Sequence, residues 1–331
     1  MKKSKEKSLE SSLSGENNAE NVIIVDNAKP AKKKKPKKVL SKKRRIFNLI
    51  VIGVLGVFSG FLLGNFYVNN FMGGIDYSQY SEISLRDNES MIISRFGSTN
   101  TANLSGVNAF IIAESKFLDK ENVSMNADGY IDAMGVKQDL LTKKYKVNDS
   151  YFVENISKGQ VILGIDTNIA ERNYYDSTTD VLKVYKGKDV QQTSTTFSEL
   201  KEELSLSEWK EKNGTTPLNF HPYIVSSKTI VSATNPKSCT LDSGDSGYII
   251  NFSLQPISSF LYVKQIKNLS GLGDYPEFVS INLEVFLNLD GTFNKIVTKE
   301  EYKVKKLGMK VSTYSNITYI FSYEASEIPS M

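Results

Sequence analysis

The chain has 331 residues, with 41 Lys and Arg against 37 Asp and Glu, and a net charge of +4 at pH 7. It contains one histidine and one cysteine, which excludes a histidine-based metal cluster and an intramolecular disulfide. Residues 1–45 contain 15 basic and 5 acidic side chains, whereas residues 46–331 contain 26 basic and 32 acidic ones. We expect no nucleic acid partner, because the larger part is acidic and phosphate neutralisation dominates such binding.

Residues 1–45 are predicted to be a disordered, basic cytoplasmic head, because they have too little apolar surface to offset the entropy cost of ordering. The basic run resembles a nuclear address, but it directly precedes an apolar segment. We therefore expect it to lie on an anionic inner leaflet, where each basic residue contributes about 1 kcal/mol. The residues expected at this membrane surface are Lys32, Lys33, Lys34, Lys35, Lys37, Lys38, Lys42, Lys43, Arg44 and Arg45.

Residues 46–68 are predicted to be a transmembrane helix. The run "IFNLIVIGVLGVFSGFLLGNFY" has no charged residue and would extend about 33 Å as a helix, enough to cross a bilayer core. The preceding region is too long for a cleaved signal peptide. Basic residues lie almost entirely on the N-terminal side of the span. The predicted topology is therefore a single-pass plasma-membrane protein with its N-terminus in the cytoplasm and its C-terminal domain outside.

Three glycines in this span, Gly56, Gly60 and Gly64, recur every four residues. On a helix they form one smooth face where another backbone can approach closely. Two interpretations remain open: the ordinary tolerance of membrane helices for glycine, and helix association, either with a second copy or with a partner membrane helix.

Residues 69–99 are predicted to form a stalk and a first amphipathic helix, and residues 100–328 an extracytoplasmic α+β domain. The segment "GVNAFIIAESKFL" (106–118) is expected to be a helix with Phe110, Ile111, Ala113 and Phe117 turned inward. Alternating strands follow over 122–157, 159–166 and 180–187. The predicted turns of the first stretch are Asp128-Gly129 and Asn148-Asp149.

The segment 195–214 is predicted to be a helix, with Ser198 as its N-cap and Gly214 just after its end. Short strands are expected at 219–225, 228–233 and 247–254. Pro256 then begins a helical stretch whose apolar face is Ile257, Phe260, Leu261 and Ile266. Three long strands, 277–290, 291–308 and 309–325, complete an antiparallel meander with a turn at Asp290-Gly291.

The predicted fold class is α+β: one N-terminal transmembrane helix, then a domain with a large curved antiparallel sheet packed by a few helices. The order of elements around "DSYFVENIS" and "FSLQPISSFLYVKQIKNLSG" resembles the LolA/LppX superfamily of lipoprotein carriers over about residues 100–325. The resemblance implies a half barrel whose apolar inner face is covered by helices. The chain departs from that family in its helical membrane anchor, because a tethered protein cannot ferry cargo. The resemblance rests on the order of elements, so it assigns no functional residue of that family to a position in this chain.

The motif "SGDSGY" (243–248) resembles the nucleophile segment of chymotrypsin-like proteases, but His221 lies only 25 residues before Ser246 and a triad is not expected. A turn is the simpler interpretation, and calcium binding by Asp242 and Asp245 is disfavoured because EF-hand spacing is absent. We expect no enzyme, cofactor or metal site.

Several single residues receive structural interpretations. We expect Cys239 and Trp209 to be buried packing residues, with a ligand platform as the alternative for Trp209. The carboxylate pairs Glu202-Glu203 and Glu300-Glu301 lie in charged runs and are predicted to be solvated.

Two functions remain in competition, with an exported enzyme disfavoured. The first is a membrane-tethered envelope module that binds a lipid or other apolar ligand. The second is a bitopic scaffold of a secretion or conjugation machine, whose outer part would be one or two small cone-shaped domains of about 120 residues each. The shape of the sheet over residues 100–325 distinguishes them: one half barrel favours the first, and two cones favour the second.

Overall fold

The computed structural model describes residues 75–133, 135–159, 168–188, 195–214, 216, 220, 222–269, 272–306, 309–324 and 328. All of them lie in one of the chain's two units, Leu63–Met331. The basic head, the predicted span with Gly56, Gly60 and Gly64, and His221 lie outside the described residues, as does nearly all of the strand predicted at 159–166. Within the described ranges, no helix has the length and apolarity needed to cross a membrane.

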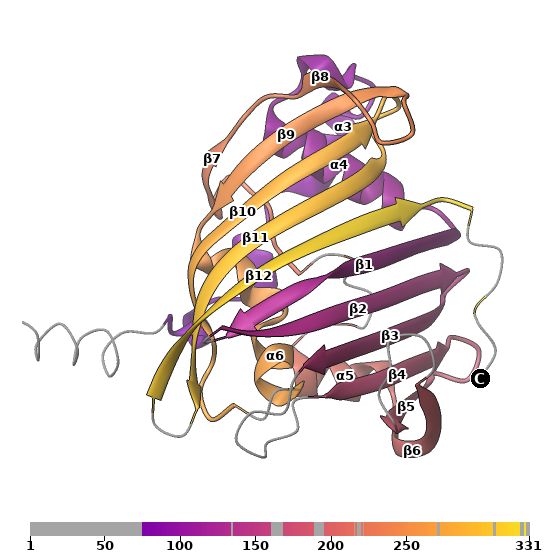
Figure 1. The fold of residues 1–331 in the computed structure, drawn as a ribbon. Coiled ribbons are helices and arrows are strands. Elements are labelled where there is room, and N and C mark those ends of the chain that lie inside the picture. The colour runs from indigo at the N-terminus through magenta and orange to yellow at the C-terminus, as the bar shows by residue number, and fades with distance from the viewer. Residues whose placement is uncertain are drawn as a thin grey trace, which may run out of the picture. The chain divides into compact units, whose positions relative to one another are not determined.

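The described strands form a single twelve-stranded antiparallel sheet (Figure 1). Its order is β6-β5-β4-β3-β2-β1-β12-β11-β10-β9-β7, and β8 also pairs with β9. An N-terminal meander, β1–β6, thus joins the C-terminal strands through the pairing of β1 with β12, and β10–β12 bend along their length. The strands are β1 Asn122–Ala133, β2 Val136–Val147, β3 Ser150–Gly159, β4 Ile169–Asp176, β5 Val181–Lys188, β6 Thr196–Leu204, β7 Ile230–Ala233, β8 Lys237–Thr240, β9 Ser246–Leu254, β10 Glu277–Asn288, β11 Phe293–Lys306 and β12 Met309–Ser322.

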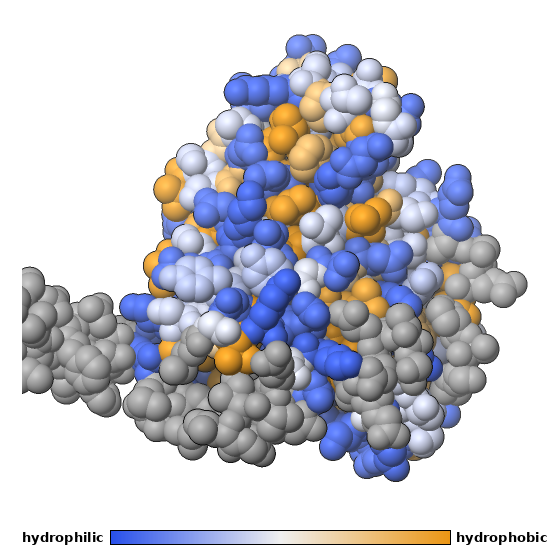
Figure 2. Space-filling view, in the orientation of Figure 1, coloured by the Kyte–Doolittle hydropathy of each residue, from blue (hydrophilic) through white to orange (hydrophobic). Residues whose placement is uncertain are grey.

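A few helices accompany the sheet, which confirms the prediction of an α+β fold built on a large antiparallel sheet. Its two faces differ: the inner face packs on helices in the hydrophobic core, and the outer face has charged pairs such as Lys299–Glu284 (3.0 Å) and exposed apolar side chains such as Ile320. Charged and apolar residues are likewise interspersed over the surface in Figure 2. The helices are η1 Tyr77–Gln79, α2 Glu82–Leu85, α3 Glu89–Phe96, η2 Thr101–Asn103, α4 Gly106–Leu118, α5 Leu206–Asn213, η3 Pro256–Leu261 and α6 Val263–Leu269.

Helix α4 fills the inner face of β9–β12, a region that we call the filled half. The four residues predicted to face inward are all buried, and Phe110 is 0% exposed. Its ring meets those of Phe252 and Phe293 edge-on, with centroids 5.7 and 5.1 Å apart. Burial of such aromatic surface is the main stabilising contribution here.

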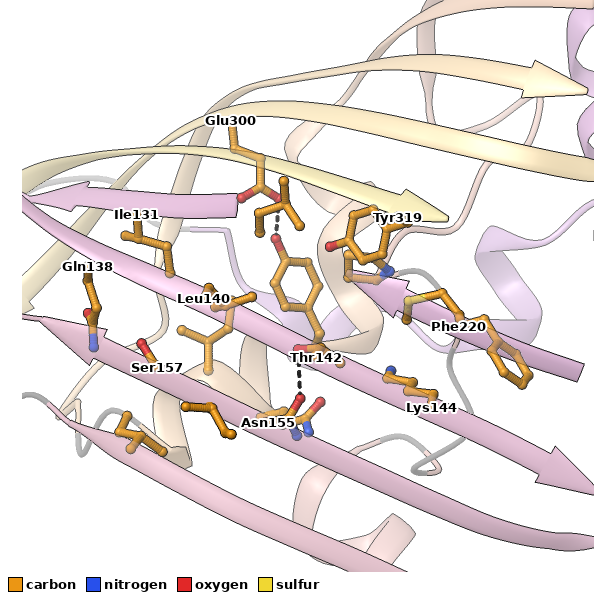
Figure 3. Close-up of a pocket in the computed structure, with 18 of the residues that line it drawn as sticks. Ile131, Gln138, Leu140, Thr142, Lys144, Asn155, Ser157, Phe220, Glu300 and Tyr319 are labelled. Carbon is orange, nitrogen blue, oxygen red and sulfur yellow. Dashed lines mark hydrogen bonds between the residues drawn. The ribbon is translucent and has the colours of Figure 1, made fainter. Parts of the chain in front are cut away.

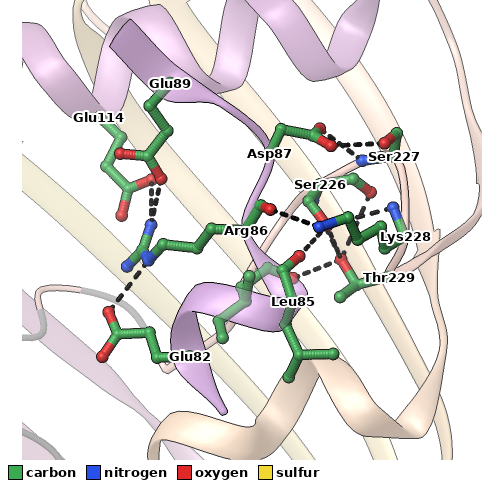
Figure 4. Close-up of polar contacts among 11 residues, drawn as sticks. Glu82, Leu85, Arg86, Asp87, Glu89, Glu114, Ser226, Ser227, Lys228 and Thr229 are labelled. Carbon is green, nitrogen blue, oxygen red and sulfur yellow. Dashed lines mark hydrogen bonds and ion pairs between the residues drawn. The ribbon is translucent and has the colours of Figure 1, made fainter. Parts of the chain in front are cut away.

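Polar contacts hold the short N-terminal helices against the loop that precedes β7 (Figure 4). The Arg86 guanidinium pairs with Glu82 (3.0 Å), Glu89 (2.7 Å) and Glu114 of α4 (3.5 Å). Its three carboxylate partners hold the pKa of Arg86 above its usual value despite desolvation. On the opposite side, Lys228 Nζ donates to the Arg86 carbonyl oxygen at 2.8 Å. Residues 75–96 are therefore part of the folded body.

The helix predicted over 195–214 is wrong in its first half. Residues Thr196–Leu204 form β6, which pairs with β5 and sets Lys183 opposite Glu203 and Lys186 opposite Glu199. Pairing of opposite charges across the strands overrides the helix propensity of the Glu and Lys residues. Helix α5 begins only after Ser205, whose capping box with Glu208 replaces the predicted cap at Ser198.

The turn predictions have mixed outcomes. Asp128-Gly129 is wrong, because both residues lie within β1, where Gly129 passes so close to the Asn316 carbonyl that a Cβ would clash at 2.2 Å. The chain reverses later, at Gly135, which has a φ of +78°. The turns at Asn148-Asp149 and Asp290-Gly291 are confirmed.

The helical stretch that begins at Pro256 is confirmed as η3 followed by α6. The short strand predicted at 219–225 is wrong in its described part, where residues 220 and 222–225 are not in a strand although Phe220 and Tyr223 are buried. The apolar pattern reflects packing on helices: the Phe220 ring lies against Phe117 of α4, with centroids 4.3 Å apart, and the Ile224 amide donates to the Ser258 carbonyl oxygen of η3 at 2.8 Å.

Candidate functional site

A pocket of about 210 Å³ lies between the inner face of the sheet and helix α6 (Figure 3). We call this region the open half. Strands β1–β4 supply one wall, β11 and β12 a second, and the helical stretch with Phe220 and Pro222 covers them. The apolar lining residues include Met125, Ile131, Leu140, Ile169, Phe220, Ile266 and Ile317.

Strand register explains why these side chains share one face. Ile131 of β1 stands opposite Gln138 of β2, and two residues on, Leu140 of β2 stands opposite Ser157 of β3. Side chains two residues apart on a strand point to the same face, so β2 directs Gln138, Leu140, Thr142 and Lys144 into the pocket. One apolar and three polar side chains of β2 therefore share its floor.

A second polar feature of the floor is a cross-strand hydrogen bond. The Thr142 hydroxyl donates to Asn155 Oδ1 at 2.9 Å (Figure 3). Nearby, burial lowers the pKa of the Lys144 ammonium to about 8.

Glu300 is the ionisable group of the opposite wall, and it is only 6% exposed. The Tyr262 hydroxyl of η3–α6 donates to Glu300 Oε1 at 2.5 Å, and the Ser315 hydroxyl donates to Oε2. Desolvation raises the pKa of Glu300 to about 7, although the bond from Ser315 acts in the opposite direction. The carboxyl group of Glu300 therefore changes between its protonated and ionised forms near neutral pH.

Three tyrosines surround this carboxyl group. Burial raises the pKa of Tyr262, Tyr302 and Tyr319, so all three remain neutral hydroxyl groups that can donate or accept. A cavity with mostly apolar walls and a few converging polar groups is the usual form of a small-molecule site. This arrangement can hold an apolar chain and orient a polar end.

The prediction that Glu300 is solvated is wrong. Glu300 and Glu301 are adjacent on a strand, so one of them must face inward, and Ser315 of β12 lies opposite Glu300 in register. The alternation of "KIVTKEEYKV" contains this signal, because Ile296, Thr298, Glu300 and Tyr302 fall on one face. The period of the strand, and not the charge of the run, determines which of the two carboxyl groups is buried.

The other single-residue predictions are resolved as follows. Trp209 is confirmed as a packing residue: it is 4% exposed and lies against Leu182 and Val184. Cys239 is only half-buried, since β8 is a short strand at the margin of the sheet.

The turn predicted for "SGDSGY" is confirmed for its first half, with Gly244 at a φ of +89°, whereas Ser246–Tyr248 begin strand β9. Asp242 of this segment pairs with Lys295 at 2.5 Å. In the described part of the chain, no three His, Cys, Asp or Glu side chains are grouped as metal ligands would be.

Comparisons with known proteins add little to this geometry. No protein-family model matches the chain, and no curated protein matches it significantly. One solved structure, an N-terminal dehydratase from the difficidin assembly line, aligns with 66% of this chain and 84% of its own at 9% identity. Its TM-score is 0.13, too low to support an argument about fold or activity.

Proposed function

We propose that the described body is a membrane-tethered, extracytoplasmic module of the cell envelope that binds the apolar chain of a lipid or similar ligand under α6. The observation that supports the proposal most is a difference in packing between two parts of the same sheet face. Phe110 and its neighbours fill the inner face beneath α4, whereas the inner face beneath α6 retains a pocket. Protein interiors are close-packed and normally contain few voids larger than a water molecule.

The single sheet also bears on the choice between the two competing functions. A scaffold built from tandem cones predicts two small sheets, whereas β1 pairs with β12 over ten residues from each strand and joins both meanders. One continuous sheet with helices on its inner face is the arrangement expected of a half-barrel carrier-like domain. This supports the binding module over the scaffold.

The size of the pocket limits the ligand. A dry cavity of about 150 Å³ accommodates benzene, and sites for drug-sized ligands occupy about 300–1,000 Å³. A pocket of about 210 Å³ suits one segment of a single alkyl chain. Glu300, Tyr262 and Lys144 are the polar groups of this pocket. They would form hydrogen bonds with any polar group of the ligand that lies beside them.

Photolabelling tests the proposal. The full-length protein in lipid nanodiscs would be irradiated with a dodecanol that has a diazirine on its alkyl chain, and labelled peptides would be mapped by mass spectrometry. We expect labels on β2 and α6, removed by excess dodecanol. Leu140→Trp should fill the pocket and reduce labelling at least about fivefold, whereas Ile320→Trp, at a position that is 55% exposed, should not. Labelling confined to surface peptides would contradict the proposal.

A further inference from the structure

A second cavity, of about 530 Å³, adjoins the pocket of the open half. It lies between β4–β6 and the helices α5 and α6, and most of the residues that line it are polar or charged. Ile169 of β4 and Gln265 of α6 line both cavities. The two cavities are therefore neighbouring parts of one groove beneath α6.

Strand register makes the floor of this groove continuous. Thr142, Asn155, Glu171 and Lys186 stand opposite one another on successive strands β2, β3, β4 and β5. The first two line the smaller pocket and the last two line the larger cavity. The groove thus changes from apolar at Ile131 and Leu140 to charged at Glu171 and Lys186 over a few strand spacings of about 4.8 Å each.

The charges of the larger cavity largely compensate one another. Lys201 lies 3.4 Å from Glu171 and 3.9 Å from Glu202, and Lys212 lies 2.5 Å from Glu202. Glu171 is 6% exposed, so its carboxylate is held mostly away from solvent. An added anion would face both carboxylates and compete with Glu202 for Lys212. A neutral hydroxyl can instead donate to a carboxylate and accept from an ammonium without breaking a pair.

Two buried polar atoms at this end have no hydrogen-bond partner among the described residues: Trp209 Nε1 and Asn173 Oδ1. Trp209 lines the larger cavity, and Asn173 Nδ2 lies 3.4 Å from Glu171 Oε1. Buried polar atoms in native structures usually have partners, so the packing beside this cavity leaves two hydrogen-bonding atoms unused.

We propose that the larger cavity binds the uncharged, hydroxyl-rich head of the same ligand whose chain occupies the smaller pocket. The ligand class is a single-chain amphiphile with a sugar-like head. This assignment rests on the proposed function, because it places the head of a chain already held under α6. Glu171 and Lys201 bind hydroxyls, and Gln265 marks the junction of chain and head.

The test compares competitors of equal chain length against the photolabel. Dodecanol, dodecyl maltoside and dodecyl phosphate would each displace the diazirine probe from full-length protein in nanodiscs. The measured quantity is the ratio of the half-displacing concentrations of dodecanol and dodecyl maltoside. Partition into lipid is the same for every protein variant, so a change in this ratio between variants reports the cavity.

The variants isolate the head site. Glu171→Gln should lower the dodecanol-to-maltoside ratio about tenfold or more, the equivalent of one hydrogen bond to a charged group. Lys201→Gln should lower the ratio as well. Its side chain is 47% exposed, so this variant should fold even if Glu171→Gln does not. Glu203→Gln, at an exposed position of β6 that stands opposite Lys183 and lines neither cavity, is the matched control and should leave the ratio unchanged.

The outcomes separate the two proposals. A ratio that is equal in the wild type, Glu171→Gln and Lys201→Gln would overturn the head site while leaving chain binding intact. A selective gain for dodecyl phosphate that is lost in Lys201→Gln would replace the neutral head with an anionic one. Absence of displaceable labelling under α6 would refute the proposed function itself.

Discussion

The filled half and the open half are two parts of one inner sheet face, yet their chemistry differs. Beneath α4, the rings of Phe110, Phe252 and Phe293 interlock and nothing polar is needed. Beneath α6, the sheet presents Thr142 and Glu300 beside a cavity of about 210 Å³. Packing of the first kind stabilises the body, and the second kind sacrifices stability for a space that a ligand can occupy. The comparison implies that truncations in the two halves have different costs.

The largest expected effect is in the filled half. Phe110→Ala should lower the free energy of unfolding by about 3–5 kcal/mol, because it leaves a cavity among rigid aromatic neighbours. Leu140→Ala, in the open half, should cost only about 1 kcal/mol, since its side chain already borders a void. Urea unfolding followed by the fluorescence of Trp209, the single tryptophan, measures both. Equal costs would remove the distinction between the halves.

The next effect is a dependence of stability on pH in the open half. Burial raises the folded-state pKa of Glu300 from 4.5 to about 7, so between these values the folded state holds a proton that the unfolded state has lost. The contribution of this group to stability therefore falls by about 3 kcal/mol as pH rises from 4.5 to 7, and is constant above.

The substitution Glu300→Gln should flatten this decline, measured as the difference in unfolding free energy between pH 5 and pH 8. Its neighbour Glu301 faces the other side of the sheet, so Glu301→Gln is the control and should retain the wild-type slope. Identical slopes for the wild type and Glu300→Gln would mean that the carboxyl group is solvated.

A smaller effect is expected where the N-terminal helices join the body. Arg86→Met should lower the unfolding free energy by about 2 kcal/mol, because it leaves Glu82, Glu89 and Glu114 close together without their shared cation. Lys299→Met removes an exposed pair with Glu284 and should change stability by less than about 0.5 kcal/mol. If both cost the same, Arg86 does not organise these helices.

The smallest effect concerns the start of α5, the helix that closes the larger cavity. Ser205→Ala removes the cap and should cost about 1 kcal/mol, whereas Ser198→Ala lies in β6 and should be nearly neutral. The same urea titrations apply. A larger cost for Ser198→Ala than for Ser205→Ala would indicate that the helix begins at Ser198.

Much of the fold could be predicted from the sequence because its signals are local. The period of "GVNAFIIAESKFL" located α4, and alternation located β9–β12. The failures arise where pairing between distant segments decides: β6 takes its form from β5, and the Asp128-Gly129 site is extended because Asn316 and Ile317 pack against it.

The candidate site was largely missed for a related reason. Glu300 lies in a run of charged residues and Glu171 is followed by Arg172, so composition alone suggests solvation. Their burial depends on register with Ser315 and Asn155, which lie on neighbouring strands. Strand alternation within "KEEYKV" could have identified Glu300, but no local signal joins β2 to α6 across more than a hundred residues.

The central claim, that the open half is a ligand site and the filled half is not, is tested most directly by methyl NMR. Isoleucine methyl groups would be labelled in the full-length protein in nanodiscs and followed during addition of dodecyl maltoside. We expect shifts for Ile131, Ile266 and Ile317, which line the pocket, and none for the buried Ile250 and Ile281 of the filled half. Shifts at Ile250 and Ile281, or at none of the five, would contradict the claim.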